Sequence, residues 1–171
     1  MREALALAEN AVGLSDPNPR VGCVILDRAG NVVGRGHTQE TGGPHAEVMA
    51  LRDAAARGSG VGGATVVVSL EPCSHHGRTP PCADALVAAG VGRVVMAMRD
   101  PNPLVAGQGA ARLAAAGIET AFGPCGDEAR ELNIGFVSRM ERGRPWLRLK
   151  AAVSLDGRTA ACGHGARTAR G

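Results

Sequence analysis

The chain has 171 residues, a formal net charge of +3, and hydrophobic and charged fractions of 44% and 20%. This composition is typical of one globular domain, and the charge is not concentrated in a run that would indicate a nucleic-acid partner. One Trp, two Phe and no Tyr offer few rings on which bases could stack, which argues against a nucleic-acid substrate. No apolar run approaches the ~18–20 residues that span a bilayer, and no signal-peptide pattern is present. We therefore expect a cytoplasmic protein with no membrane partner.

Apolar periodicity and turn signals predict helices that alternate with strands along the chain. The sequence DRAGN between the first two strands is typical of a hairpin turn. In chain order we expect a helix at 2–14, strands at 21–26 and 32–37, a helix at 45–58, a strand at 64–70, a helix at 80–90, a strand at 91–100, a helix at 110–117, a strand at 118–122, a helix at 127–143 and a strand at 145–157. This order predicts a three-layer α/β/α sandwich around a mixed, mostly parallel sheet with one antiparallel edge.

Residues that can bind a metal occur where these elements begin and end. His45 begins a helix, Cys73 follows a buried strand, and Cys82 opens the next helix. Because the carboxyl ends of neighbouring strands meet at one crevice of an α/β sheet, we expect these three side chains to come together. One nitrogen and two sulfur ligands suit Zn²⁺, one ion per chain. Three protein ligands leave the fourth position for water, which indicates a catalytic rather than a structural site.

Glu47 follows His45 by two residues, so it can face the metal-bound water without binding the metal. The pattern H-x-E followed by P-C-x-x-C is the signature of zinc deaminases, and His45–Glu47 and Pro72–Cys73 fit it. The second half differs, because eight residues rather than two separate Cys73 from Cys82. Each pattern alone is common by chance, and paired cysteines are often only small buried hydrophobes. Their combination at element boundaries favours a catalytic zinc site.

The other histidines and cysteines have weaker claims on a metal. His75 and His76 lie in the middle of a loop, where they could compete as ligands. Cys23 lies in an apolar strand and is expected in the core, whereas Cys125 and Cys162 have no evident partner. Five cysteines are an odd number, so we expect no disulfide framework.

Four segments, "DPNPRVGCVI", "PHAEVMAL", "SLEPCSHHGRTPPCADAL" and "RDPNPLVAGQG", resemble the deaminase domain of the bifunctional riboflavin-biosynthesis deaminase/reductase. The resemblance extends from residue 1 to about residue 160. The long loop between the two cysteines is its specific part, because tRNA adenosine deaminases carry the short C-x-x-C form. The resemblance implies a cytidine-deaminase-like fold. It also implies hydrolytic deamination of 2,5-diamino-6-ribosylamino-4(3H)-pyrimidinone 5′-phosphate to 5-amino-6-(5-phosphoribosylamino)uracil and ammonia.

The same resemblance implies roles for particular residues. His45, Cys73 and Cys82 would bind zinc, and Glu47 would transfer protons. Further side chains are candidates for contacts with the phosphorylated pyrimidine, although Asp and Asn are also ordinary turn formers. These candidates are Asn18, Arg78, Thr79, Asp100 and Asn102.

The sequence departs from the family pattern at two places. Many relatives carry a histidine seven residues before the zinc histidine; here Thr38 occupies that position and His37 precedes it, so a substrate contact there is in question. The segment "LKAAVSLDGRTA" resembles the opening of the family's reductase domain, which is otherwise absent. We therefore expect a deaminase domain at 1–145 and a flexible tail at 146–171, in a shortened or naturally short protein. NADP is not an expected cofactor, and the family implies a homo-oligomer, dimeric or tetrameric.

Two other functions compete with this interpretation. One is a zinc deaminase of another nucleobase or nucleoside, such as cytidine or adenosine in tRNA; the long loop, Arg78 and the few aromatic rings argue against it. The other is a catalytically silent scaffold domain. The intact set of metal ligands and Glu47 argues against a silent domain.

Overall fold

The structure is a computed structural model that describes residues 1–75, 80–103, 105–155 and 157–159. The helices are α1 (Arg2–Glu9), α2 (Ala46–Ala56), α3 (Cys82–Ala88), α4 (Gln108–Ala115), α5 (Gly126–Leu132) and α6 (Ile134–Arg142). The strands are β1 (Gly22–Leu26), β2 (Val32–His37), β3 (Thr65–Val68), β4 (Arg93–Met96) and β5 (Glu119–Phe122). Across the described ranges, no helix combines the length and the apolar character that crossing a membrane requires.

The strands form one sheet in the order β2-β1-β3-β4-β5. β1 is antiparallel to both of its neighbours, whereas β3, β4 and β5 are parallel to one another. β2, β3, β4 and β5 therefore run in one direction, and β1 is reversed. The predicted mixed sheet with an antiparallel hairpin at one edge is confirmed. The reversed strand itself lies inside the sheet, because β1 pairs with β3 as well as with β2.

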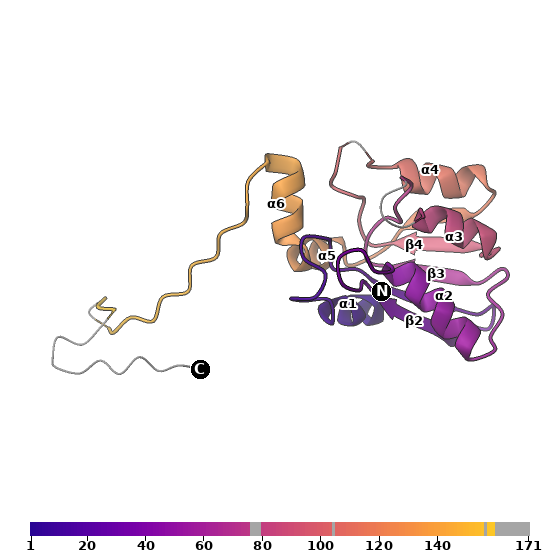
Figure 1. The fold of residues 1–171 in the computed structure, drawn as a ribbon, viewed down its shortest axis with the longest axis horizontal. Coiled ribbons are helices and arrows are strands. Elements are labelled where there is room, and N and C mark those ends of the chain that lie inside the picture. The colour runs from indigo at the N-terminus through magenta and orange to yellow at the C-terminus, as the bar shows by residue number, and fades with distance from the viewer. Residues whose placement is uncertain (76–79, 104, 156, 160–171) are drawn as a thin grey trace.

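Helices cover both faces of this sheet, as Figure 1 shows. Gly22 pairs with His37, so Gly22 and Gly36 face opposite sides. A Cβ on Gly22 would lie 1.9 Å from the carbonyl oxygen of Ala4 in α1, and a Cβ on Gly36 would lie 2.3 Å from that of Ala46 in α2. These close approaches place α1 and α2 on opposite faces. α3 packs beside α2, α4 packs beside α3, and α5 contacts α1, which confirms the three-layer sandwich.

The core is made of small and branched aliphatic side chains. The alanines of α2 that face the sheet are fully buried, which lets the helix lie close to β2 and fixes the position of its first turn. The central strands supply most of the remaining volume. The largest fully buried aliphatic side chains are Ile25, Val66, Val68, Leu86, Val94, Met96, Leu113 and Val137.

The single helix predicted at 127–143 is wrong, because the chain turns at Asn133 between α5 and α6. Asn133 is 3% exposed, and its side chain binds the backbone of Arg20 twice. Its Oδ1 accepts from Arg20 N at 2.7 Å, and its Nδ2 donates to Arg20 O at 2.9 Å. The helix is interrupted at Asn133, where the side chain makes these hydrogen bonds to a distant backbone segment. The break redirects α6, whose Phe136 and Met140 line the cavity described below.

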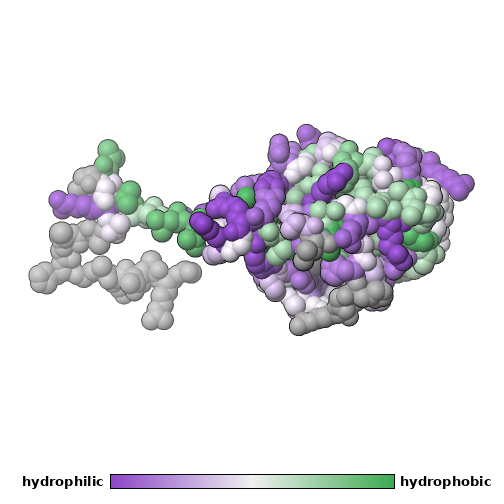
Figure 2. All heavy atoms as spheres, turned by 90° about the horizontal axis from the view of Figure 1, so that it is seen from above, coloured by the Kyte–Doolittle hydropathy of each residue, from purple (hydrophilic) through white to green (hydrophobic). Residues whose placement is uncertain are grey.

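The strand predicted at 145–157 is also wrong. Residues 145–154 have no regular secondary structure, and Figure 1 shows the segment after α6 leading away from the sheet. Its large side chains are exposed, including Leu147 at 86% and Leu149 at 93%, and the segment forms an apolar strip in Figure 2. A strand is stable only beside a partner, and no described segment pairs with this one.

Candidate active site

Four chain segments meet at one end of the strands of the sheet. The register pairs Gly22 with His37, Cys23 with Val68, and Val68 with Met96. The carboxyl ends of β2, β3 and β4 therefore lie beside the amino end of the reversed β1. We call residues 69–81 the β3 loop and residues 97–107 the β4 loop. A cavity of about 460 Å³ opens where these segments converge, as expected for an α/β sheet.

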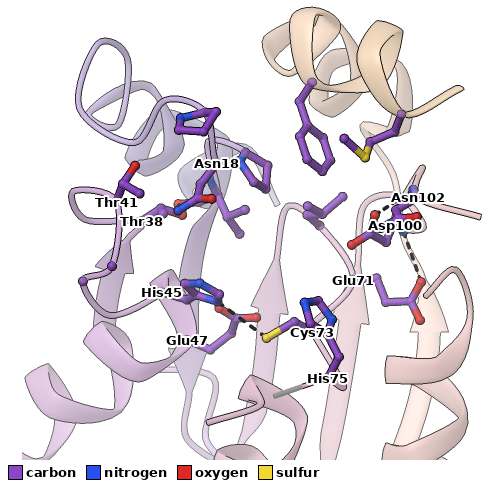
Figure 3. Close-up of a pocket in the computed structure, with 18 residues that line it drawn as sticks. Asn18, Thr38, Thr41, His45, Glu47, Glu71, Cys73, His75, Asp100 and Asn102 are labelled. Carbon is purple, nitrogen blue, oxygen red and sulfur yellow. Dashed lines mark hydrogen bonds between the residues drawn. The ribbon is translucent and has the colours of Figure 1, made fainter. Parts of the chain in front are cut away.

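Three potential metal ligands lie together at this cavity, as predicted. His45 is the last extended residue before α2, Cys73 lies in the β3 loop, and Cys82 is the first residue of α3. His45 Nδ1 is 3.6 Å from Cys73 Sγ and 3.3 Å from Cys82 Sγ. The three ligand atoms all lie within 4.8 Å of one another. Figure 3 shows His45, before α2, and Cys73, in the β3 loop, pointing toward each other.

These distances fit a zinc ion. Tetrahedral zinc, with bonds of about 2.1 Å to nitrogen and about 2.3 Å to sulfur, holds the two atoms about 3.6 Å apart. The observed nitrogen–sulfur separations of 3.3 and 3.6 Å are close to that value. One imidazole and two thiols are also the donor types that zinc prefers. The three residues can therefore hold zinc, and a set of three protein ligands leaves a fourth position for water.

Hydrogen bonding prepares one thiol for a metal. The backbone N–H of Cys82, at the start of α3, donates to Cys73 Sγ at 3.3 Å. The hydrogen bond from the Cys82 thiol lowers the pKa of Cys73 to about 4, and the same bond together with burial raises the pKa of Cys82. The bond to Cys73 also raises the pKa of His45. The set thus favours a thiolate at Cys73, which is the form that binds a metal.

Glu47 lies in the first turn of α2, beside the three ligands. Its side chain is 3% exposed, and Figure 3 shows the carboxylate directed toward Cys73. Burial raises the pKa of Glu47 to about 7, and the nearby Cys73 adds to the rise. Glu47 Oε2 is buried and accepts no hydrogen bond from any residue that the structure describes. Buried polar oxygens almost always have partners, so this oxygen marks a place for a polar group of a bound molecule.

Of the remaining candidate histidines and cysteines, Cys23 lies in the core as predicted. His75 lines the cavity, and His76 lies outside the described residues. Cys23 is fully buried in β1, and burial raises its pKa, as expected for a core thiol. Cys125 is partly exposed before α5, and Cys162 lies outside the described residues. Each of the four cysteines in the described ranges is a free thiol.

Three of the five predicted substrate residues line the cavity. Asn18 precedes β1 on one side, and Asp100 and Asn102 lie in the β4 loop on the other. Arg78 and Thr79 lie outside the described residues, so their predicted phosphate contacts stay predictions.

Thr38, at the position where the resemblance implies a histidine, also borders the cavity. Its hydroxyl accepts from Val21 N at 3.2 Å and lies 3.4 Å from Val21 O, to which it donates. The hydroxyl thus ties β2 to the segment that enters β1.

Asp100 and Asn102 form a polar wall opposite Asn18, as Figure 3 shows. Asp100 Oδ1 accepts from Asn102 N at 2.9 Å, which closes a tight turn within the β4 loop. Burial raises the pKa of the Asp100 carboxyl. The two residues form a turn and also line the cavity. A role as turn formers is therefore compatible with a role as substrate contacts.

Among the lining residues that the sequence did not mark as site candidates are Glu71, Phe136 and Met140. Glu71 stands directly before Pro72–Cys73, and a charged residue at the end of a buried strand could have indicated a role. Phe136 and Met140 are four residues apart in α6, so their shared helix face was visible in the sequence. What the sequence did not show is that the break at Asn133 brings this face over the cavity.

The fold and this site together define a class of zinc-binding deaminases. Residues 1–98, more than half of the chain, match the family model described as the cytidine and deoxycytidylate deaminase zinc-binding region. The chain belongs to this family.

Comparison with individual proteins shows which members of the family this chain is similar to. The Riboflavin biosynthesis protein RibD of Escherichia coli (strain K12) is 56% identical over 160 residues, which are 94% of this chain and 42% of that protein. Riboflavin biosynthesis protein PYRD, chloroplastic, of Arabidopsis thaliana is 48% identical over 157 residues, which are 92% of this chain and 36% of that protein. The chain therefore spans less than half the length of these relatives.

Solved structures agree with this assignment. Acinetobacter baumannii RibD, form 2, superposes with a TM-score of 0.89 at 50% identity, over 98% of this chain and 46% of that one. A deaminase/reductase structure from Thermotoga maritima gives a TM-score of 0.86 at 41% identity, over 92% and 44% of the two chains. The resemblance to the riboflavin-biosynthesis enzymes and the predicted cytidine-deaminase-like fold are confirmed.

Proposed function

We propose that this chain catalyses hydrolytic deamination of 2,5-diamino-6-ribosylamino-4(3H)-pyrimidinone 5′-phosphate. The products are 5-amino-6-(5-phosphoribosylamino)uracil and ammonia. One observation supports the reaction type above all: a nitrogen–sulfur–sulfur ligand set lies together with a buried carboxylate, one oxygen of which has no partner among the residues that the structure describes. His45, Cys73 and Cys82 would hold zinc, and Glu47 would act as general acid and base.

Bound zinc supplies Lewis-acid chemistry, lowering the pKa of a water molecule toward about 7. Glu47 accepts the proton that this water loses. Because its side chain is 3% exposed, the proton is kept from bulk solvent until transfer. Glu47 then donates this proton to the ring nitrogen next to the carbon that bears the 2-amino group. It next takes the second proton from the hydroxyl newly bonded to that carbon and passes it to the departing amine. A carbon–oxygen bond forms, the carbon–nitrogen bond breaks, and ammonia leaves.

The choice of substrate is supported by the relatives and by the polar cavity walls. The Thermotoga maritima structure is named a diaminohydroxyphosphoribosylaminopyrimidine deaminase/5-amino-6-(5-phosphoribosylamino)uracil reductase. Asn18, Asp100 and Asn102 offer amide and carboxylate groups that match the amino, carbonyl and ribose groups of such a pyrimidine. We assign the phosphate to Arg78 and Thr79 of the β3 loop, since a guanidinium binds phosphate well.

We extend the proposal to domain organisation and assembly. Residues 1–145 form the deaminase domain, and the segment from residue 146 corresponds to the opening of the reductase half that the Thermotoga protein's name includes. We also propose a cytoplasmic homo-oligomer with a small-molecule substrate.

A paired measurement tests this function. Metal content is determined on the purified chain, and ammonia release is followed with the diaminopyrimidine ribosylamine phosphate, cytidine and adenosine as substrates. We expect about one zinc ion per chain and turnover of the first substrate alone. Turnover of cytidine or adenosine instead would replace the substrate and leave the chemistry. Absence of zinc from the freshly purified protein would overturn the metal site and the reaction with it.

A further inference from the structure

Glu71 is a buried carboxylate that the proposed chemistry does not use. Its side chain is 4% exposed, and it accepts hydrogen bonds from three backbone N–H groups. Its Oε2 accepts from Asp100 N at 3.1 Å and from Gly107 N at 3.0 Å. Its Oε1 accepts from Ala110 N at 3.0 Å. Charge-assisted bonds of this kind are about twice as strong as neutral ones, so Glu71 holds these groups firmly.

These three donors lie at the two ends of one segment. Asp100 N begins the turn that forms the polar wall of the cavity, whereas Gly107 and Ala110 begin α4. Gly107 precedes α4 with φ +82° and has no side chain to cap the helix. Glu71 therefore takes the place of a capping side chain for the first turn of α4, where unpaired N–H groups favour a negative charge.

The same residue is tied to the metal-binding side. Glu71 precedes Cys73 by two residues, and its own N–H donates to Met98 O at 3.0 Å. One residue further on, Pro72 touches α4, because a Cβ on Gly109 would lie 2.0 Å from Pro72 O. The β3 loop and the β4 loop are thus joined through Glu71 and its neighbour. Displacement of either loop moves the other.

We propose that Glu71 is a positioning residue for substrate: it fixes the distance between the wall formed by Asp100 and Asn102 and the set His45, Cys73 and Cys82. Its two oxygens already accept three N–H groups, close to the capacity of a carboxylate, so it acts through the backbone and not on the ring. This inference rests on the proposed function, in which the wall contacts the substrate while the ligand set performs the chemistry. Loss of Glu71 then weakens substrate binding and leaves the metal in place.

The variant Glu71→Gln tests this role at constant size. We call the three hydrogen bonds that Glu71 accepts from Asp100, Gly107 and Ala110 the clamp. A carboxamide keeps one acceptor oxygen but points an NH₂ group at N–H donors, so part of the clamp is replaced by repulsion. We expect KM to rise about tenfold, kcat to stay within about twofold, and zinc content to be unchanged. Glu119→Gln is the matched control, because Glu119 is also a glutamate of the sheet region, at the start of β5, but is 66% exposed and pairs with Arg93. The control should keep the KM of the parent chain.

A double-mutant cycle with Asp100→Ala adds a readout that a general loss of stability would not give. If Glu71 acts through Asp100, the two changes raise KM together by less than the product of their separate effects. Multiplicative effects, an unchanged KM in Glu71→Gln, or loss of zinc from that variant would each overturn the inference.

Amide hydrogen exchange separates this inference from the proposed function. In Glu71→Gln, the amides of Asp100, Gly107 and Ala110 should exchange faster, whereas the amide of Val67 in β3 should not change. Failure of the parent chain to deaminate the substrate would reject the function, and exchange would still test the clamp. Unchanged exchange at the three amides would reject the clamp whatever the substrate.

Discussion

The β3 loop and the β4 loop leave neighbouring parallel strands at the same edge of the sheet, yet their functional groups are held in different ways. In the β3 loop, Cys73 meets His45 and Cys82 through side chains that converge on one point. In the β4 loop, Asp100 is held through its backbone N–H by the carboxylate of Glu71. The first arrangement fits a metal ion, and the second forms a wall of the cavity.

The comparison separates two kinds of function at one site. Residues that bind a metal must have particular side chains, so their loss changes chemistry. Residues that shape a wall need a fixed backbone, so their loss changes affinity. Changes of the metal-binding side chains should therefore act on zinc and turnover, whereas changes of the wall, or of Glu71 that holds it, should act on KM.

The largest effect is expected from Cys73→Ser. A serine hydroxyl is a poor zinc ligand at neutral pH, so the variant should lose more than about 100-fold in zinc affinity and with it deamination. Metal content after dialysis and ammonia release measure both losses. Cys125→Ser, at a partly exposed cysteine before α5, should keep zinc and turnover. Full zinc content in Cys73→Ser would remove Cys73 from the ligand set.

Glu47→Gln should keep its zinc and lose turnover. An amide of the same shape cannot accept and return a proton, and general acid–base groups contribute about 10²- to 10⁴-fold to rates. The check is kcat at saturating substrate, alongside metal content. Near-normal turnover with zinc present would show that Glu47 does not transfer the proton.

Gly109→Ala should press the β3 loop and α4 apart. Its Cβ would lie 2.0 Å from Pro72 O, and relief of this overlap should cost about 1–3 kcal/mol in the free energy of unfolding. Denaturant unfolding measures the change. Gly135→Ala in α6 is the matched control, because a Cβ there meets nothing within 4 Å and should leave stability equal or slightly higher. Equal stability of both variants would mean that Pro72 and α4 are not held together.

The smallest effect is expected from Asp100→Ala. Loss of a single polar contact with the substrate should raise KM about tenfold, with zinc content and kcat little changed. Asp27→Ala is a suitable control, because Asp27 also accepts backbone N–H groups in a turn, at the opposite end of β1. A fall in zinc content in Asp100→Ala would contradict the division between the metal ligands and the wall.

The sequence predicted which side chains come together at the candidate metal site. His45, Glu47, Cys73 and Cys82 were visible because few residue types bind zinc or transfer protons, and each stands at an element boundary. The cavity position of Asn18 was predicted from resemblance. Its physical reason is the reversal of β1, which brings the amino end of that strand to the same edge as the carboxyl ends of the others.

The role of Glu71 could not be predicted in the same way. Its three partners are backbone N–H groups, which every residue except proline has, so no pattern of residue types marks them. The break between α5 and α6 was hidden for a similar reason. The periodicity of 127–143 is continuous, and it is the backbone of Arg20, more than a hundred residues earlier, that binds Asn133.

By itself, the sequence determined the order of the elements, the layered fold and the set of side chains that can bind zinc, because hydrophobic periodicity and donor chemistry are local properties of residue types. Only the tertiary structure decided how the chain surrounds that set: the direction of β1 within the sheet, the turn at Asn133 and the clamp at Glu71. Each of these depends on hydrogen bonds that a backbone group makes with a residue far away in the chain. Such bonds form wherever folding brings a donor and an acceptor together, and residue identity alone does not specify the pair.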